Sequence, residues 1–291
     1  MPRPAAFPRR FLAAAASVLL AAAATADPGG ARDGAPGPRG GALEDALPAE
    51  PDGRTIYERV LENRFRAYEQ TSRLVSGDRG GAEQESRLRM TWQSFRDGDG
   101  RPSAGVLSKS LVKYTHPFDL RYSGYLIQNN AGRPNDQFVY LASSRRIRRV
   151  NLRSEAVFGT DFTFEDVLPR ELEEASYQRL PDEAVQGVAC YVVDVTPTPE
   201  SDSQYSRFVV AVEKLHFVPI RTRYWDERGV EVKELVADPA QIQEFGGVFI
   251  PMFLTMRNLQ LDTYTSLHVE ELLANPELEA TTFDLRRLET H

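Results

Sequence analysis

Apolar residues in this chain recur at helical spacing in one short stretch and at strand spacing almost everywhere after it. The stretch 55–68 has apolar residues every three or four positions with charged residues between them, which predicts an amphipathic helix. Further on, apolar and polar residues alternate in short runs, as at Leu88, Met90 and Trp92. We therefore expect a fold made mainly of β-structure.

The alternating runs predict a series of strands separated by turn residues. They lie at 85–96, 104–115, 119–128, 136–142, 144–152, 188–196, 206–213, 218–226, 229–237, 248–258 and 263–270. Because most connections between them are short, we expect the strands to pair as an antiparallel meander. Short helices are expected at 162–167, near 171–174 and at 239–245.

Two of the predicted strands are apolar on both faces. In 191–193 and 208–212, neighbouring residues that point to opposite sides of a sheet are all apolar. Both faces must then be covered there, and the few predicted helices can cover about one of them. Either the sheet curls and packs on itself as a closed barrel, or an open apolar groove holds a guest molecule. The residues alone leave both alternatives open.

The first 26 residues have the features of a cleavable signal peptide. Three arginines precede an apolar run at 11–24, and Ala24-Thr25-Ala26 forms an A-x-A cleavage site. The run is too short to span a bilayer, which needs about 20 residues. The only cysteine, Cys190, lies far from the cleavage site, so we expect no lipobox. These features predict a soluble protein in the periplasm, without a transmembrane helix.

Composition then divides the remaining chain into a tether and one domain. Residues 27–53 are rich in Gly, Pro, Ala and Asp without an apolar period, which predicts a disordered tether. A single domain is expected at 54–291, acting as a monomer. Without the three arginines of the leader, 32 basic residues remain against 42 acidic ones, a net charge of −10. This charge argues against nucleic acid as a partner.

The sequence shows no arrangement typical of an enzyme or a metal site. The four histidines are not at metal-ligand spacing, and no HExxH, G-x-S-x-G, G-x-G-x-x-G or P-loop motif occurs. We therefore expect no catalytic residue, no cofactor and no bound metal. A hydrolase of cell-envelope polymers is a less favoured alternative, because the two carboxylates of a glycosidase need not be close in sequence.

The most distinctive stretch is 138–167, where an apolar strand runs into a cluster of arginines. The cluster comprises Arg145, Arg146, Arg148, Arg149 and Arg153. The first four are candidates for binding phosphate headgroups or an acidic partner surface. The alternative is an edge strand that its charge protects from aggregation. Neighbouring arginines of a strand point to opposite faces, so these four cannot all serve one site.

Two motifs stand in this stretch. The first is Tyr140-Leu141 followed by Arg146-Ile147-Arg148-Arg149, and the second is Phe158-Gly159-Thr160-Asp161-Phe162-Thr163-Phe164-Glu165-Asp166. Both resemble motifs of the outer membrane lipoprotein-sorting family, the LolA-like proteins, although the family's spacing residue before Gly159 is absent. Pro219-Ile220-Arg221, the stretch 247–252, and 275–278 with Phe283 are similar as well. The similarity thus runs through most of 54–291.

The resemblance implies a mainly β (α+β) fold, in which a strongly curved antiparallel sheet forms an incomplete barrel closed by a few helices. It also implies an apolar cavity for the acyl chains of a lipid or lipoprotein. An inner-membrane lipid exporter of the resistance-nodulation-division type and an outer-membrane acceptor are the implied partners. Large or flexible apolar side chains are the candidates for lining the cavity, and ordinary core packing is their alternative. These candidates are Met90, Trp92, Ile250, Met252, Leu254 and Met256.

The expected function is therefore that of a periplasmic carrier, which binds acyl chains in an apolar cavity and moves them between membranes. A lipid-sensing regulatory module on the same fold is the alternative.

Overall fold

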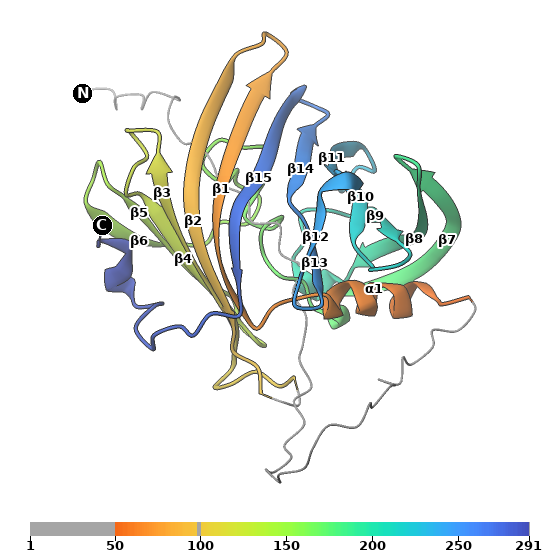
Figure 1. Ribbon diagram of the computed structural model, residues 1–291, viewed down its shortest axis with the longest axis horizontal. Helices are drawn as coiled ribbons and strands as arrows, with labels where there is room; N and C mark the ends of the chain where they lie inside the picture. Colours follow the sequence, from red (N-terminus) through yellow and green to blue (C-terminus); the bar gives the residue numbers. More distant parts are fainter. Residues whose placement is uncertain (1–49, 98–99, 291) are drawn as a thin grey trace, which may run out of the picture.

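One large antiparallel sheet dominates the computed structural model, which describes residues 50–97 and 100–290 (Figure 1). Its thirteen strands are β1 (Ala67–Asp78), β2 (Glu83–Ser94), β3 (Val106–His116), β4 (Gly124–Asn130), β5 (Asp136–Leu141), β6 (Arg146–Val150), β7 (Ala175–Val185), β8 (Val188–Pro197), β9 (Arg207–Glu213), β10 (Pro219–Trp225), β11 (Glu231–Ala237), β14 (Phe253–Asn258) and β15 (Thr263–Ala274). A separate hairpin consists of β12 (Ile242–Phe245) and β13 (Val248–Pro251). The helical elements are α1 (Gly53–Glu62) and four short 3₁₀ turns: η1 (Leu172–Glu174), η2 (Pro199–Ser201), η3 (Pro239–Gln241) and η4 (Leu285–Leu288).

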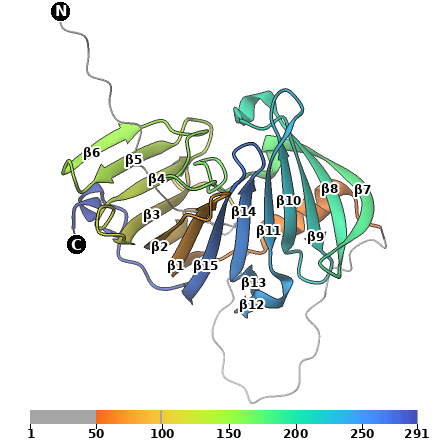
Figure 2. The ribbon, with the colours of Figure 1, turned by 90° about the horizontal axis from the view of Figure 1, so that it is seen from above.

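The strand order explains the shape of the molecule. It runs β6-β5-β4-β3-β2-β1-β15-β14-β11-β10-β9-β8-β7, so β1 and β15 join the two meanders at the centre. Figure 2 shows the sheet as an arc from β6 to β7. In the described part of the chain these two edges do not pair, and the sheet is not closed into a barrel. The expected curved antiparallel sheet is confirmed. Of the two alternatives for covering its apolar faces, a closed barrel and an open groove, the closed barrel is wrong.

The helix α1 forms where the amphipathic pattern predicts one, but it is shorter. The carboxylate of Asp52 caps it by accepting a hydrogen bond from the backbone N of Thr55 (2.7 Å), and the apolar face packs against β7 and β8. The predicted last turns up to residue 68 are wrong. Tyr68 belongs instead to β1, whose backbone pairs with β2 on one side and β15 on the other.

Several other predictions of secondary structure fail for identifiable reasons. The strand β1 was not expected because it buries polar residues such as Gln70 and Ser72, and β7 because it is a largely exposed edge strand. The helix expected at 239–245 is wrong, since η3 occupies only its start and β12 pairs with β13 after it. The stretch 162–167 forms turns instead of a helix. A few helices were expected to close the incomplete barrel. In the described ranges, α1 is the only α-helix.

Both faces of β8 and β9 are covered, as their sequences require. Val193 and Val210 are cross-strand partners and belong to the main apolar cluster together with Val60 of α1. Residues next to them along the strands, such as Ala211, face the other way and pack in a second cluster against Phe249 of the β12–β13 hairpin. We call the face of the sheet that carries Val193 and Val210 the inner face.

The carboxyl-terminal stretch covers the opposite, outer face of β3–β6. Phe283 and Leu288 are buried there against Leu126 and Tyr140. The Lys113 ammonium donates to the backbone carbonyls of Arg287 (3.1 Å) and Thr290 (2.9 Å), which holds the end of the chain on the sheet. The tail residues that resemble the LolA-like family therefore complete the outer core.

The predicted signal peptide (1–26) and most of the predicted tether (27–53) lie outside the described residues. Gly53, the last residue of the predicted tether, is already the first residue of α1. Within 50–97 and 100–290, none of the helices has the length and apolar character needed to cross a bilayer.

Replacement of Phe283 tests the role of the tail. Phe283→Ala should lower the free energy of unfolding by about 3 kcal/mol, because it leaves a cavity between the tail and the sheet. Leu285→Ala, in the same tail but 40% exposed, is the matched control and should change it by no more than about 0.5 kcal/mol. Urea denaturation followed by circular dichroism measures both, and equal effects of the two changes would contradict this assignment.

Candidate functional site

The inner face of the sheet carries four of the six candidates for lining a cavity. Met90 and Trp92 on β2 and Leu254 and Met256 on β14 are each no more than 2% exposed and belong to one apolar cluster. Ile250 is half-buried at the margin of this cluster. Met252 lies between β13 and β14 and is 9% exposed.

An irregular stretch of chain covers these residues. We call residues 152–170 the covering segment; it contains the second motif of the sequence analysis. Its buried apolar side chains, Val157, Phe158, Phe162, Phe164 and Val167, belong to the same cluster as Met90 and Trp92. The lining candidates therefore pack against the protein's own chain in this structure.

Aromatic contacts hold the covering segment against β3 and β4. The ring of Phe158 meets that of Tyr114 edge-on at 5.2 Å, and Phe164 meets Tyr125 in the same way at 5.6 Å. Beneath the segment, the Nε1 of Trp92 and the hydroxyl of Tyr114 are buried without a hydrogen-bond partner in the described ranges. The segment thus covers this face with apolar side chains but leaves some polar groups of the sheet without hydrogen-bond partners.

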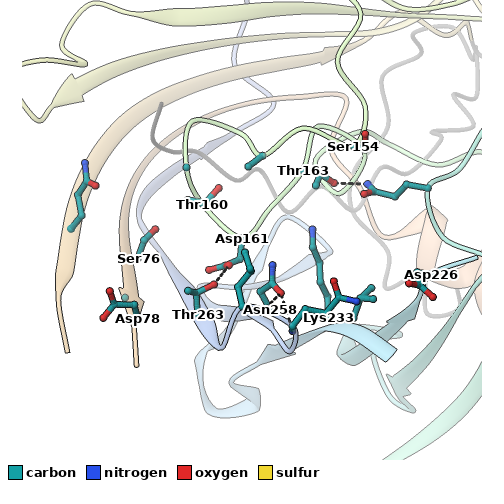
Figure 3. A pocket seen from close by; sticks show the side chains of 18 of the residues that line it. Ser76, Asp78, Ser154, Thr160, Asp161, Thr163, Asp226, Lys233, Asn258 and Thr263 are labelled. Atoms are coloured by element: carbon teal, nitrogen blue, oxygen red, sulfur yellow. Dashed lines mark hydrogen bonds between the residues drawn. The ribbon is translucent and has the colours of Figure 1, made fainter. Parts of the chain in front are cut away.

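Asp161 attaches the segment to the centre of the sheet. Its carboxylate accepts a hydrogen bond from the hydroxyl of Thr263 on β15 (Figure 3). It also accepts one from the hydroxyl of Thr265 on the same strand, at 2.9 Å. Its backbone N also donates to the hydroxyl of Thr265 (3.1 Å). The neighbouring strand thus supplies hydroxyl groups as the partners of this carboxylate.

Asp166 provides a second attachment through a buried ion pair. Its carboxylate lies 2.8 Å from the ammonium of Lys233 on β11 and accepts a hydrogen bond from the hydroxyl of Tyr205 (2.7 Å). Burial acts to raise the pKa of Asp166, but the charge of Lys233 and the hydrogen bonds from Lys233, Thr163 and Tyr205 outweigh it and hold this pKa below its usual value. Asp166 is therefore ionised at neutral pH.

The adjacent Glu165 contributes a third set of polar contacts. It accepts from the backbone N of Gln204 (2.8 Å) and lies 3.5 Å from Arg153 and 3.6 Å from Arg170. Arg170 also stacks on the ring of Phe208, with its guanidinium carbon 4.4 Å from the ring centre. The covering segment is thus attached to the sheet by apolar packing and by side-chain polar contacts.

Two cavities lie on either side of the Asp166–Lys233 pair. The outer cavity has a volume of about 820 Å³ and opens beside the turns β1–β2, β10–β11 and β14–β15 (Figure 3). The inner pocket has a volume of about 110 Å³ and is lined mainly by residues of α1, β9, β10 and β11, with Leu254 of β14, and most of these residues are apolar, such as Leu61 and Phe208. Lys233 lines the outer cavity and Asp166 the inner pocket, so the ion pair stands between them.

The size of the inner pocket limits what it can hold. A cavity of about 150 Å³ accommodates a molecule of benzene, and the inner pocket is smaller than that. A long acyl chain therefore fits only if side chains of the covering segment move away from the sheet. Of the six candidates from the sequence, Leu254 is the one that appears among the described residues lining this pocket. The sequence analysis did not single out Lys233, which lines the outer cavity. The signal was the alternation Lys233-Leu235-Ala237, which places one lysine among apolar residues on a single face of β11.

The structure places the four candidate arginines away from both cavities. Arg145, Arg146, Arg148 and Arg149 are exposed in the β5–β6 turn and on β6, which is an edge strand of the sheet. Arg149 pairs with Asp136 on β5. Cys190 is buried in the second apolar cluster, and burial raises the pKa of its thiol. The described ranges contain no group of His, Cys, Asp and Glu that could hold a metal ion.

The fold matches solved structures of LolA-like proteins. A domain from Vibrio parahaemolyticus described as an outer membrane lipoprotein-sorting protein domain has a TM-score of 0.73 at 21% identity, over 82% of this chain and 98% of that one. A DUF1329 family protein from Desulfovibrio piger has a TM-score of 0.72 at 20% identity, over 80% and 95%. A LolA superfamily protein from Nitrosomonas europaea has a TM-score of 0.63 at 17% identity, over 82% and 100%. The chain therefore has the LolA-like fold.

Sequence comparison assigns the chain to a family. A family model described as "Uncharacterized protein" matches residues 107–290, which is more than half of the chain, and the chain belongs to this family. No curated protein matches the sequence.

Breaking the buried ion pair should destabilise the protein in a way that depends on pH. At pH 7, Asp166→Asn should lower the free energy of unfolding by about 3 kcal/mol, because it leaves the charge of Lys233 buried without a counterion. The pKa of Asp166 is lowered in the folded state, so its stabilisation is present above the unfolded value of about 3.9 and is lost as the pH falls through the folded value. The difference between variant and parent should therefore shrink below about pH 4.

The matched control is Asp166→Asn combined with Lys233→Met, which removes both charges. The double variant should be more stable than Asp166→Asn alone. Denaturant titrations from pH 3 to pH 8 measure all three proteins. A loss of stability in Asp166→Asn that is the same at every pH would contradict the ion-pair account.

Proposed function

We propose that this protein is a lipid carrier, which takes up an acyl chain between the inner face of its sheet and the covering segment. The observation that carries the proposal is the way this face is covered. Irregular chain lies over the apolar side chains of β2, β3, β4 and β14, next to an unfilled inner pocket and a wide outer cavity. The LolA-like fold supports the same proposal.

Uptake of an acyl chain is energetically reasonable because the chain would replace the covering segment as the apolar cover of the inner face. An acyl chain gains about 0.8 kcal/mol for each methylene that it removes from water. On entering, it would take over the contacts that Val157, Phe158 and Phe162 make with the sheet, so the inner face stays dry in both states. The Trp92 Nε1 and the Tyr114 hydroxyl are buried without hydrogen-bond partners in the described ranges. Because buried polar groups are normally satisfied in a permanent interface, this favours a covering segment that a ligand can displace.

In this proposal the candidate residues have distinct roles. Met90, Trp92, Leu254 and Met256 form the surface that the chain contacts after the covering segment has moved, and Ile250 lies at its margin. Met252 follows β13 directly in the chain. The carrier acts in the periplasm, where the predicted signal peptide would direct it. It would receive lipid or lipoprotein from an inner-membrane exporter of the resistance-nodulation-division type and deliver it to an outer-membrane acceptor.

Filling the inner pocket tests this proposal. Leu61→Trp, on the pocket side of α1, should reduce the amount of bound lipid severalfold, because the indole occupies the space that the chain needs. Glu58→Trp, on the exposed side of the same helix, is the matched control and should bind as the parent does. The full chain is isolated from the periplasm without detergent, and its bound lipid is extracted with organic solvent and quantified by mass spectrometry.

Parent protein that contains no lipid after isolation and takes up none from phospholipid vesicles would overturn the proposed function. Equal lipid content in parent and Leu61→Trp would remove the inner pocket from the account.

A lipid-sensing module is the second candidate, and the open edge strand favours it. The four exposed arginines on and beside β6 offer a surface for an acidic partner protein, at a distance from the cavities. Transfer of labelled lipid between donor and acceptor vesicles separates the two functions. A carrier increases the rate in proportion to its concentration, whereas a sensor binds lipid without delivering it.

A further inference from the structure

The outer cavity has an unbalanced set of charges. Asp78, Glu83, Asp161 and Asp226 line it, and Lys233 is the one cationic side chain in its lining. The charge of Lys233 is already neutralised by Asp166 at 2.8 Å. Any ligand group that enters this cavity therefore meets a negative surface.

Asp161 is the deepest of these carboxylates. It is 8% exposed, and both of its oxygens accept hydrogen bonds from neutral threonine hydroxyls. Among residues 50–97 and 100–290, no cationic group lies within ion-pair distance of it, that is, within 4.0 Å. A buried carboxylate without a counterion is costly, and a cationic group of a ligand would remove that cost.

Two of the other acids of the lining have only neutral hydrogen-bond donors as partners among the described residues. Glu83 accepts a hydrogen bond from the neutral hydroxyl of Tyr264, and Asp78 accepts from the backbone N of Gly80. Asp226, in contrast, is neutralised by Arg228, which donates to its carboxylate at 2.9 and 2.7 Å. The charges of Asp78, Glu83 and Asp161 are thus open to a ligand.

An apolar lip borders the same cavity. Leu261 lines it and is 71% exposed, and its neighbours Leu259 and Val230 are 48% and 47% exposed. The backbone N of Leu259 donates to the carbonyl of Val232 (2.9 Å), which brings the β14–β15 turn beside the β10–β11 turn. Apolar side chains next to a negative cavity match a molecule that is itself both apolar and positively charged.

We infer that the outer cavity binds the ammonium group of an amine-bearing lipid headgroup, with Asp161 as its principal counterion. The inference rests on the proposed function, because the acyl chain of the same lipid would extend past the Asp166–Lys233 pair towards the inner pocket. Ethanolamine headgroups carry such an ammonium group. Headgroups that bear only negative charge, such as that of phosphatidylglycerol, are disfavoured by the acidic lining.

Binding of two lysolipids with the same acyl chain tests this inference. Lysophosphatidylethanolamine and lysophosphatidylglycerol share the phosphate and differ in the ammonium group. The full chain should bind the former about tenfold more tightly, which corresponds to about 1.4 kcal/mol. Tryptophan fluorescence and isothermal titration calorimetry, with both lysolipids below their micelle-forming concentrations, measure the two affinities.

Asp161→Asn is the decisive variant, because it removes the charge and keeps groups that can hydrogen-bond to both threonines. Its preference for the ethanolamine lysolipid should fall to within about twofold, with an unchanged unfolding midpoint. Asp262→Asn, at the neighbouring turn but outside the lining, is the matched control and should keep the full preference. If Asp161→Asn is also less stable than the parent, the variant Asp161→Ser shows whether the lost charge or the lost stability removes the preference for the ethanolamine lysolipid. The inference is supported if the folded fraction of Asp161→Ser binds both lysolipids with similar affinity.

Three results would count against these claims, and they are distinguishable. Equal affinity of the parent for both lysolipids, or a preference that survives Asp161→Asn, overturns the inference and leaves the proposed carrier function intact. Binding of neither lysolipid overturns the proposed function and, with it, this inference.

Discussion

The apolar inner face of an open sheet has to be kept from water, and every other feature of this protein follows from that constraint. A closed barrel would bury this face by strand pairing, but here β6 and β7 remain separate edges. The helix α1 covers the β7–β8 end, and the covering segment covers the rest with side chains such as Phe158 and Phe164. Because the segment is neither helix nor strand, few backbone hydrogen bonds oppose its movement.

Polar contacts attach this apolar cover to the sheet at two points. The segment is attached through Asp161 to β15 and through Asp166 to β11. The Asp166–Lys233 pair is almost fully buried, and such a pair adds little net stability compared with apolar packing, although breaking it is costly. The pair lies between the outer cavity and the inner pocket. Its main role in this account is therefore to separate these two spaces, and stabilising the fold is secondary. In the proposed function, a polar headgroup would be bound on one side of it and an apolar chain on the other.

Much of the sheet could be predicted from the sequence, because alternation of apolar and polar residues reports strands with one buried and one wet face. The strands β1 and β7 escaped, since one buries Gln70 and Ser72 and the other is an exposed edge. The double-sided apolar pattern at 208–212 correctly indicated cover on both faces. The sequence could not identify that cover, because tertiary packing brings α1 to one face of β9 and the hairpin β12–β13 to the other.

The candidate site was predicted less completely than the fold. Met90 and Leu254, two of the candidates for lining a cavity, belong to the apolar cluster of the inner face, and a sequence pattern does not distinguish contact with a guest from contact with the protein's own loop. The motif at 158–166 was identified as distinctive, and its position over the sheet now gives a physical reason for its aromatic residues. Lys233 was missed because a single charged residue in a strand is usually solvated.

The central claim is that a bound acyl chain replaces the covering segment on the inner face. Hydrogen exchange of individual backbone amides, measured with and without a bound lysolipid, tests it most directly. The account predicts faster exchange at Val157 and Phe164, whose amides bond to carbonyls within the segment, and unchanged exchange in β9. Saturating lipid that leaves the exchange of residues 152–170 unchanged or slower would contradict the account.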